Sequence, residues 1–184
     1  MLALFLTMID SESDRVKFMR LYNEYRHTMY RTANAILKDS YLAEDAVQEA
    51  FVRIIKNLHK IDGADSRQTK VFLAIIVKNV SLTMQARHNA GLIFSFDDAA
   101  EPESASEYSL ADEIESKEGL SNLLEVIDKL PSMYKNPLLL KYYIDLEVGE
   151  IAQSLGLPLK TVQKQIERGR QILAERLKEK SVSI

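Results

Sequence analysis

The sequence predicts an all-α protein made of two small helical domains that are joined by a flexible acidic linker. Apolar residues recur three and four positions apart in residues 13–88 and again in residues 118–184, which is the spacing of one face of an α-helix. Residues 89–117 offer too little apolar surface to offset the entropy cost of ordering the chain. Residues 1–12 form an N-terminal extension, which we expect to be disordered or only lightly packed.

The composition narrows the possible classes of function. The chain has 184 residues and no cysteine, which excludes disulfides and thiolate zinc sites. His27, His59 and His88 are scattered, and the sequence has no phosphate-binding glycine loop or nucleophile motif. We therefore expect no enzyme activity, no cofactor and no metal. Residues 1–9 are apolar but too short to span a bilayer, so we expect a cytoplasmic protein without membrane insertion.

The net charge of −3 is unevenly distributed along the chain. Residues 1–88 carry 13 basic and 10 acidic side chains, and residues 118–184 carry 10 basic and 9 acidic ones. Residues 89–117 carry 1 basic and 8 acidic side chains. The acidity of the chain therefore belongs to the linker, and the flanking domains remain compatible with a nucleic-acid partner.

The first domain is expected to contain three helices, over residues 13–38, 41–58 and 69–88. Asp39 and Ser40 interrupt the first apolar stripe and supply an N-cap for the second helix. Residues 62–66 contain Asp, Gly and Ser and are expected to form a loop before the third helix. Phe72 of the third helix is expected to lie in the core rather than to stack on a base.

The second domain is expected to begin with a helix over residues 120–130 that Pro131 ends. A further helix is expected to begin at Pro137 and to reach Tyr143, because this stretch contains three consecutive leucines. These two helices would provide the core against which the remaining part of the domain packs.

Residues 148–166 are typical of a helix-turn-helix. The first helix must stop at Gly156, which suits a left-handed C-terminal position, and Pro158 cannot continue that helix. The second helix is expected to open at Leu159 or Thr161. Its outward positions carry donors and amides suited to a DNA major groove, namely Lys160, Gln163, Lys164, Glu167 and Arg168. An αα-hairpin inside a helical core is the alternative interpretation.

Several short motifs, taken in order and spacing, resemble one known family. They are AEDAVQEAF at 43–51, LPSMY at 130–134, LLKYY at 139–143, and EIA, LG and TV within 150–162. The chain thereby resembles the extracytoplasmic-function (ECF) sigma factors, the small two-domain members of the bacterial sigma-70 family. The resemblance implies that residues 13–88 are sigma region 2 and that residues 118–184 are sigma region 4.

The second helix carries a polar face suited to a basic partner. Asp45, Gln48, Glu49 and Val52 lie at i, i+3, i+4 and i+7, so they share one side of the helix. The resemblance implies that this face binds core RNA polymerase at the clamp coiled coil of its largest subunit, and that the flap of the polymerase is a second contact. A solvated helix face without a partner is the alternative.

The resemblance assigns promoter DNA to two other helices. The third helix is expected to hold the −10 element as single-stranded DNA through Lys70, Lys78, Asn79, Gln85, Arg87 and His88. The helix after the turn is expected to read the −35 element through Lys160, Thr161, Gln163, Lys164, Glu167 and Arg168. Gln165, Glu167 and Gly169 depart from the family pattern, and the third helix ends with fewer arginines than is typical of the family.

We therefore predict an RNA polymerase sigma factor that directs promoter-specific transcription initiation and is controlled by an anti-sigma factor. A polymerase-independent helix-turn-helix regulator is the alternative. That alternative would explain residues 148–170 but not the polar face in residues 45–52. A sigma-like protein that binds polymerase without initiating transcription is a third interpretation.

Overall fold

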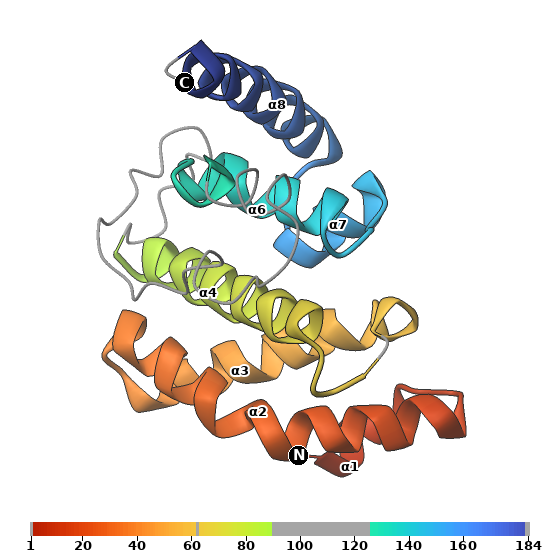
Figure 1. Cartoon of the computed structure of the whole chain (residues 1–184). Helices are drawn as coiled ribbons and strands as arrows, with labels where there is room; N and C mark the ends of the chain where they lie inside the picture. The colour runs from red at the N-terminus through yellow and green to blue at the C-terminus, as the bar shows by residue number, and fades with distance from the viewer. Residues whose placement is uncertain (1, 62, 90–125, 183–184) are drawn as a thin grey trace. The chain divides into compact units, whose positions relative to one another are not determined.

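The computed structural model describes residues 2–61, 63–89 and 126–182, and every described element is helical, as the sequence predicts (Figure 1). The chain forms two compact units, which we describe separately. The predicted linker, residues 89–117, lies outside the described residues except for Asn89, as does most of the helix predicted over residues 120–130.

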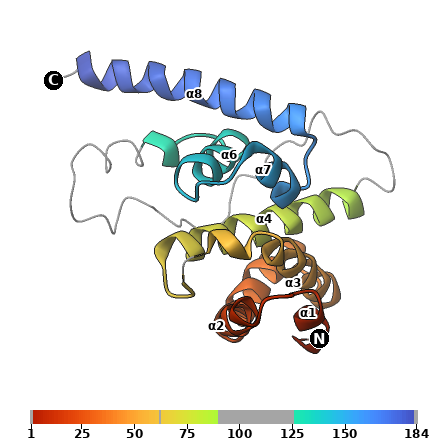
Figure 2. The ribbon, with the colours of Figure 1, turned by 90° about the vertical axis from the view of Figure 1, so that its right-hand side faces the viewer.

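The first unit contains α1 (Leu2–Thr7), α2 (Glu12–Leu37), α3 (Ser40–Ile55), the 3₁₀ helix η1 (Leu58–Lys60) and α4 (Arg67–Asn89). The three long helices α2, α3 and α4 pack pairwise against one another, and they lie side by side in both views (Figures 1 and 2). The three helices predicted for this domain are therefore confirmed. The second of them is shorter than predicted, because α3 ends at Ile55 and the chain tightens into η1.

Local sequence signals set the ends of these helices. The Ser11 hydroxyl accepts a hydrogen bond from the Asp14 N–H at the start of α2 (3.4 Å). The predicted cap of α3 is confirmed at Asp39, whose carboxylate accepts hydrogen bonds from the N–H groups of Tyr41 (2.8 Å) and Leu42 (3.0 Å). Lys38 adopts a left-handed conformation (φ 54°) between the two helices, and this residue turns the chain.

The core of the first unit is formed by large apolar side chains from all three long helices. Phe18, Leu21, Phe51, Ile54, Phe72 and Ile76 are each at most 1% exposed. The expectation that Phe72 is a core residue is confirmed. A closely packed core of this kind holds α3 and α4 in fixed orientations, so each presents a defined outer face.

The expectation that residues 1–12 are disordered or lightly packed is wrong. Residues 2–7 form α1, and Phe5 is only 2% exposed. Its ring centroid lies 5.6 Å from that of Phe18 and 5.9 Å from that of Phe51, so α1 closes an aromatic cluster on α2 and α3. A six-residue helix is too short to show a helical period, and burying one large aromatic side chain is what holds it in place.

The second unit contains a helical turn at residues 126–128, α6 (Ser132–Tyr142), α7 (Val148–Leu155) and α8 (Leu159–Val182). The prediction that a helix begins at Pro137 is wrong. The helix begins at Ser132, because the Pro131 carbonyl accepts hydrogen bonds from the N–H groups of Tyr134 and Lys135, both at 2.9 Å. Pro137 lies inside α6, where its missing N–H removes one helical hydrogen bond.

The turn of the helix-turn-helix forms as predicted. Gly156 ends α7 in a left-handed conformation (φ 67°, ψ 34°), which a residue with a side chain adopts only at a cost. The Leu157 N–H then bonds back to the Ala152 carbonyl (3.0 Å), and α8 begins at Leu159, one of the two predicted positions.

A close helix crossing fixes α8 against α6. A Cβ atom added to Gly169 would lie 3.0 Å from Leu138 Cδ1 and 3.2 Å from Tyr134 Cβ. Further along α8, the Arg176 guanidinium donates to the Lys129 carbonyl (2.8 Å). The departure from the family pattern at Gly169 therefore has a packing role, since any side chain there would press against α6 at this approach.

Candidate functional site

The polar face predicted on α3 is present in the structure. Asp45 is exposed, and Gln48, Glu49 and Val52 are partly exposed along the same side of the helix. The opposite side is made of residues with no measurable exposure: Ala43, Ala46, Ala50, Phe51 and Ile54. Because the small alanines let α3 pack closely in the bundle, the polar side chains stand on a rigid support.

The two carboxylates of this face are not equivalent. Glu49 forms an ion pair with Arg53 one turn further along α3. Asp45 forms no ion pair with any residue that the structure describes. Asp45 therefore offers the more accessible negative charge to a basic partner, and Glu49 offers a carboxylate whose position Arg53 restrains.

The sequence analysis missed one residue on this face. Tyr41 lies four positions before Asp45 and is 82% exposed, more than any other large hydrophobic side chain of the described residues. Tyr41, Asp45, Gln48 and Val52 lie at i, i+4, i+7 and i+11, so all four project from the same side of α3. The spacing alone indicates this position, because Tyr41 lies one helical turn before Asp45.

The residues predicted to bind the −10 element are distributed around α4. Lys70, Lys78, Gln85 and His88 lie within about 80° of one another around the helix axis, whereas Asn79 and Arg87 project from other sides. Lys70 is exposed in the first turn, and Arg87 and His88 are exposed in the last turn. The rise of the helix separates Lys70 from Arg87 by about 26 Å, so the basic side chains mark a long track rather than one patch.

Two of the residues predicted to bind the −10 element have polar side-chain atoms that are bonded or buried within the first unit. The Gln85 side-chain amide donates to the Ile36 carbonyl (2.7 Å) and so joins α4 to the end of α2. The Asn79 side-chain oxygen is buried and accepts no hydrogen bond from any residue that the structure describes. Gln85 therefore contributes to packing, and Lys70, Arg87 and His88 are the predicted residues most accessible to a nucleic acid.

The helix after the turn, α8, presents five of its six predicted residues on a single outer face. Lys160, Gln163, Lys164, Glu167 and Arg168 are all exposed, whereas Thr161 is half-buried. Val162 (0% exposed) and Ile166 (9%) lie on the inner side. No hydrogen bond or ion pair with a described residue occupies Gln163, Lys164, Glu167 or Arg168. The face therefore offers donors of both charged and amide type, together with one carboxylate that can accept hydrogen bonds.

The comparison with family models agrees with both helical units. The Sigma-70 region 2 model matches residues 21–90, which contain the polar face of α3 and all of α4. The Sigma-70 region 4 model matches residues 120–173, which contain the helix-turn-helix. The chain belongs to the ECF sigma factors of the sigma-70 family. Members of this family are not enzymes, and the region 2 match excludes the alternative of a polymerase-independent regulator.

Two relatives from Bacillus subtilis (strain 168) are similar to this sigma factor over most of its length. ECF RNA polymerase sigma factor SigW is 27% identical over 176 residues, covering 91% of this chain and 92% of the relative. ECF RNA polymerase sigma factor SigM is 26% identical over 153 residues, covering 83% and 90%. A co-crystal structure of the sigma factor RpoE with the anti-sigma factor NepR from Bartonella quintana covers 88% of this chain and 96% of that one. It is 17% identical with a TM-score of 0.37, which supports no inference.

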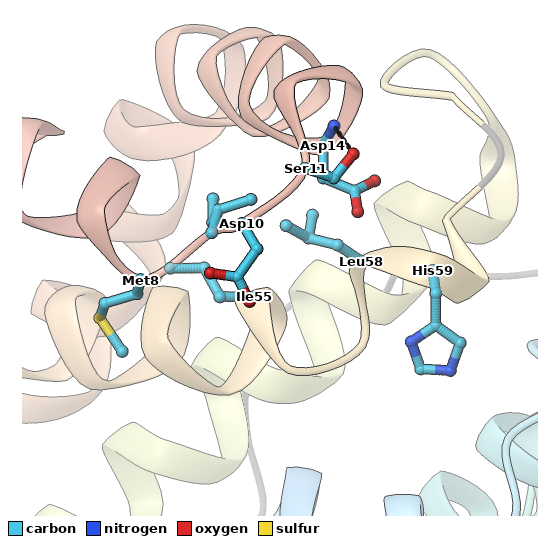
Figure 3. Close-up of a pocket in the computed structure, with 8 residues that line it drawn as sticks. Met8, Asp10, Ser11, Asp14, Ile55, Leu58 and His59 are labelled. Carbon is cyan, nitrogen blue, oxygen red and sulfur yellow. Dashed lines mark hydrogen bonds between the residues drawn. The ribbon is translucent and has the colours of Figure 1, made fainter.

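This sigma factor also has a small open pocket near α1. It has a volume of about 230 Å³ and lies where the turn after α1 meets α3 and η1 (Figure 3). Met8, Asp10 and Asp14 line one side, and Ile55, Leu58 and His59 line the other. No group of three or more His, Asp or Glu side chains in the described residues could hold a metal ion. We assign the pocket no ligand.

The described helices of this sigma factor also lack a membrane-spanning segment. None of them is long and apolar enough to cross a bilayer. Phe5 of α1 packs against Phe18 of α2 and Phe51 of α3.

Proposed function

We propose that this sigma factor binds core RNA polymerase through α3 and directs it to promoters whose −10 element contacts α4 and whose −35 element contacts α8. The observation that carries the proposal is the pair of exposed polar faces on rigid helices. One lies on α3 in region 2, and the other lies on α8 in region 4. A protein with this arrangement can bind one protein partner and hold it at a fixed position on duplex DNA.

Core polymerase is the partner of α3 in this proposal. Asp45 supplies an exposed carboxylate, Gln48 supplies an amide, and Val52 supplies apolar area at the end of the face. We assign the clamp coiled coil of the largest subunit to this face and treat the flap as a second contact, in keeping with the family. Such a mixed surface suits a basic helix, because charge guides the encounter and apolar contact slows dissociation.

Single-stranded −10 DNA is the proposed ligand of α4. Lys70 near its start and Arg87 and His88 at its end would contact phosphates along the strand. Lys78 lies between them. Because the cations are few, we expect melting to depend strongly on each of them and on salt concentration.

Duplex −35 DNA is the proposed ligand of α8. The first two turns carry Lys160, Gln163 and Lys164, and in a helix-turn-helix these turns reach base edges in the major groove. Thr161 is half-buried and would contact the DNA backbone. Arg168 lies one turn beyond Lys164, where a phosphate contact is expected.

The remaining assignments rest on family membership. We propose that residues 89–117 act as a tether that lets regions 2 and 4 reach their separate DNA elements. We propose further that the factor works in the cytoplasm and that an anti-sigma factor controls it by covering one or both exposed faces.

Reconstituted holoenzyme tests the proposal. The variant Asp45→Lys/Glu49→Lys should lose core-polymerase affinity by about 30-fold or more, the loss typical of an interface hot spot. Glu24→Lys/Asp65→Lys changes two exposed carboxylates that lie outside α3, makes the same charge change and should bind core polymerase normally. Run-off transcription with mapped 5′ ends then separates an active factor from a sigma-like protein that binds without initiating. Equal affinity of both double variants would overturn the assignment of the polymerase to α3.

A further inference from the structure

The exposed ring of Tyr41 is the feature of region 2 that the functions above leave unexplained. Its side chain is 82% exposed, although tyrosine has a large apolar ring that normally gains free energy from burial. A single exposed aromatic residue is ordinary on a protein surface, and Tyr142 on α6, 59% exposed, is an example. Tyr41 differs from Tyr142 in its position relative to a proposed interface.

The position of Tyr41 is in line with the polar face of α3. It precedes Asp45 by four residues and Gln48 by seven, so its ring leaves the helix on the same side as these two side chains. The face thereby begins with an aromatic ring at Tyr41, continues through a carboxylate and an amide, and ends with apolar area at Val52. Its length from Tyr41 to Val52 is about 16 Å, from the rise of the helix.

No contact among the described residues of region 2 accounts for the ring. The hydrogen bond that caps α3 uses the Tyr41 backbone N–H and the Asp39 carboxylate, so it is independent of the Tyr41 side chain. The ring also takes no part in the aromatic cluster of Phe5, Phe18, Tyr22 and Phe51. Alanine would serve equally well at this position of the helix, since its helix propensity is higher than that of tyrosine.

We propose that Tyr41 is an aromatic anchor of the interface with core RNA polymerase. Tyrosine is one of the residue types that contribute most at protein interfaces, because its ring buries a large area while few rotatable bonds are fixed. A ring at one end of the face would enter an apolar recess beside the basic surface that receives Asp45. The proposal rests on the assignment of α3 to the polymerase, and it commits the ring to that partner rather than to DNA.

The test is a comparison of single variants of the full-length chain in equilibrium binding to core polymerase. Tyr41→Ala should weaken binding by about 10- to 30-fold, the range expected for an aromatic hot spot. Tyr142→Ala, the matched exposed aromatic on α6, should bind as the wild type does. Tyr41→Phe should keep most of the affinity, because the ring rather than the hydroxyl supplies the buried area. The helix content and melting temperature of Tyr41→Ala should not fall.

The salt dependence of binding distinguishes the contribution of the Tyr41 ring from that of the charged side chains. The affinity lost in Tyr41→Ala should be nearly the same at low and high salt, whereas the affinity lost in Asp45→Lys should shrink as salt screens the charge. Unchanged affinity of Tyr41→Ala, or a loss no greater than that of Tyr142→Ala, would overturn the anchor. If Asp45→Lys/Glu49→Lys is defective in that same experiment, the α3 assignment survives and only the anchor fails. If neither variant is defective, both fail.

Discussion

The two helices proposed to bind DNA, α4 and α8, differ in how their predicted contact residues are arranged. Five of those on α8 lie on one exposed face, opposite the buried Val162 and Ile166. Those on α4 are spread along most of the length of the helix, Asn79 and Arg87 project from other sides than the rest, and Gln85 is engaged with the Ile36 carbonyl. Reading a duplex requires one face that fits a groove, whereas holding a single strand requires cations along a path. The difference in arrangement therefore matches the difference between the two proposed ligands.

The largest expected effect concerns the packing that holds the α8 face in place. Gly169→Val should destabilise region 4 by about 3 kcal/mol, because the added side chain would overlap α6 at Leu138 and Tyr134. Region 4 would then lose −35 recognition while region 2 keeps its −10 contacts. Thermal unfolding of the full chain, with protection of each region followed by hydrogen exchange, measures this effect.

Gly149→Ala is the matched control for this variant. Gly149 lies in α7, and no atom lies within 4 Å of an added Cβ, so alanine should be neutral or stabilising by at most about 1 kcal/mol. A Gly169→Val protein that melts like the wild type would show that the α6–α8 crossing is loose, and the rigid single face of α8 would then have no structural basis.

The next effect concerns base reading by α8. Gln163→Ala and Lys164→Ala should relax sequence preference at the bases they touch, by roughly 1–3 kcal/mol of discrimination. Arg168→Ala should instead weaken binding to all sequences and reduce the slope of log affinity against log salt by about 0.9. Holoenzyme binding to a panel of −35 variants at two salt concentrations measures both quantities.

The two outcomes for α8 are distinguishable within that panel. If wild-type, Gln163→Ala and Lys164→Ala proteins give identical sequence profiles, α8 does not read bases, and the contrast with α4 disappears. If Arg168→Ala changes the sequence profile rather than the salt slope, Arg168 reads a base and the reading face extends one turn further along α8.

The sequence predicted the helical elements because their signals are local and repeated. The stripes of α2, α3 and α4, the cap at Asp39 and the turn at Gly156 each depend on residues within a few positions. The shared faces on α3 and α8 could be predicted to the same extent, since residues at helical spacing project from one side of a helix; that these faces bind polymerase and DNA stays a prediction. The resemblance to ECF sigma factors supplied their partners, which spacing alone does not identify.

The features that the sequence did not reveal depend on contacts between distant residues. Phe5 is ordered because Phe18 and Phe51 surround it, and no local pattern encodes that cluster. The packing role of Gly169 and the engagement of Gln85 likewise follow from which helix lies opposite. One error was local instead: the run of leucines after Pro137 favours a helix that begins there, but Pro131 starts the helix earlier.

The smallest expected effect tests whether Gln85 of α4 serves packing within region 2 rather than DNA binding. Gln85→Ala removes the hydrogen bond to the Ile36 carbonyl and should destabilise region 2 by about 1 kcal/mol. Because the amide is engaged in packing, the variant should leave the salt dependence and sequence preference of −10 binding unchanged. Arg87→Ala, an exposed residue two positions away, should do the reverse and weaken single-strand binding without lowering the melting temperature. Paired thermal melts and binding of a single-stranded −10 oligonucleotide by holoenzyme give both readouts.

A Gln85→Ala protein with normal stability and impaired strand binding would show that Gln85 exchanges its partner in α2 for DNA. The contact surface of α4 would then be more continuous, and more similar to that of α8, than the free protein indicates.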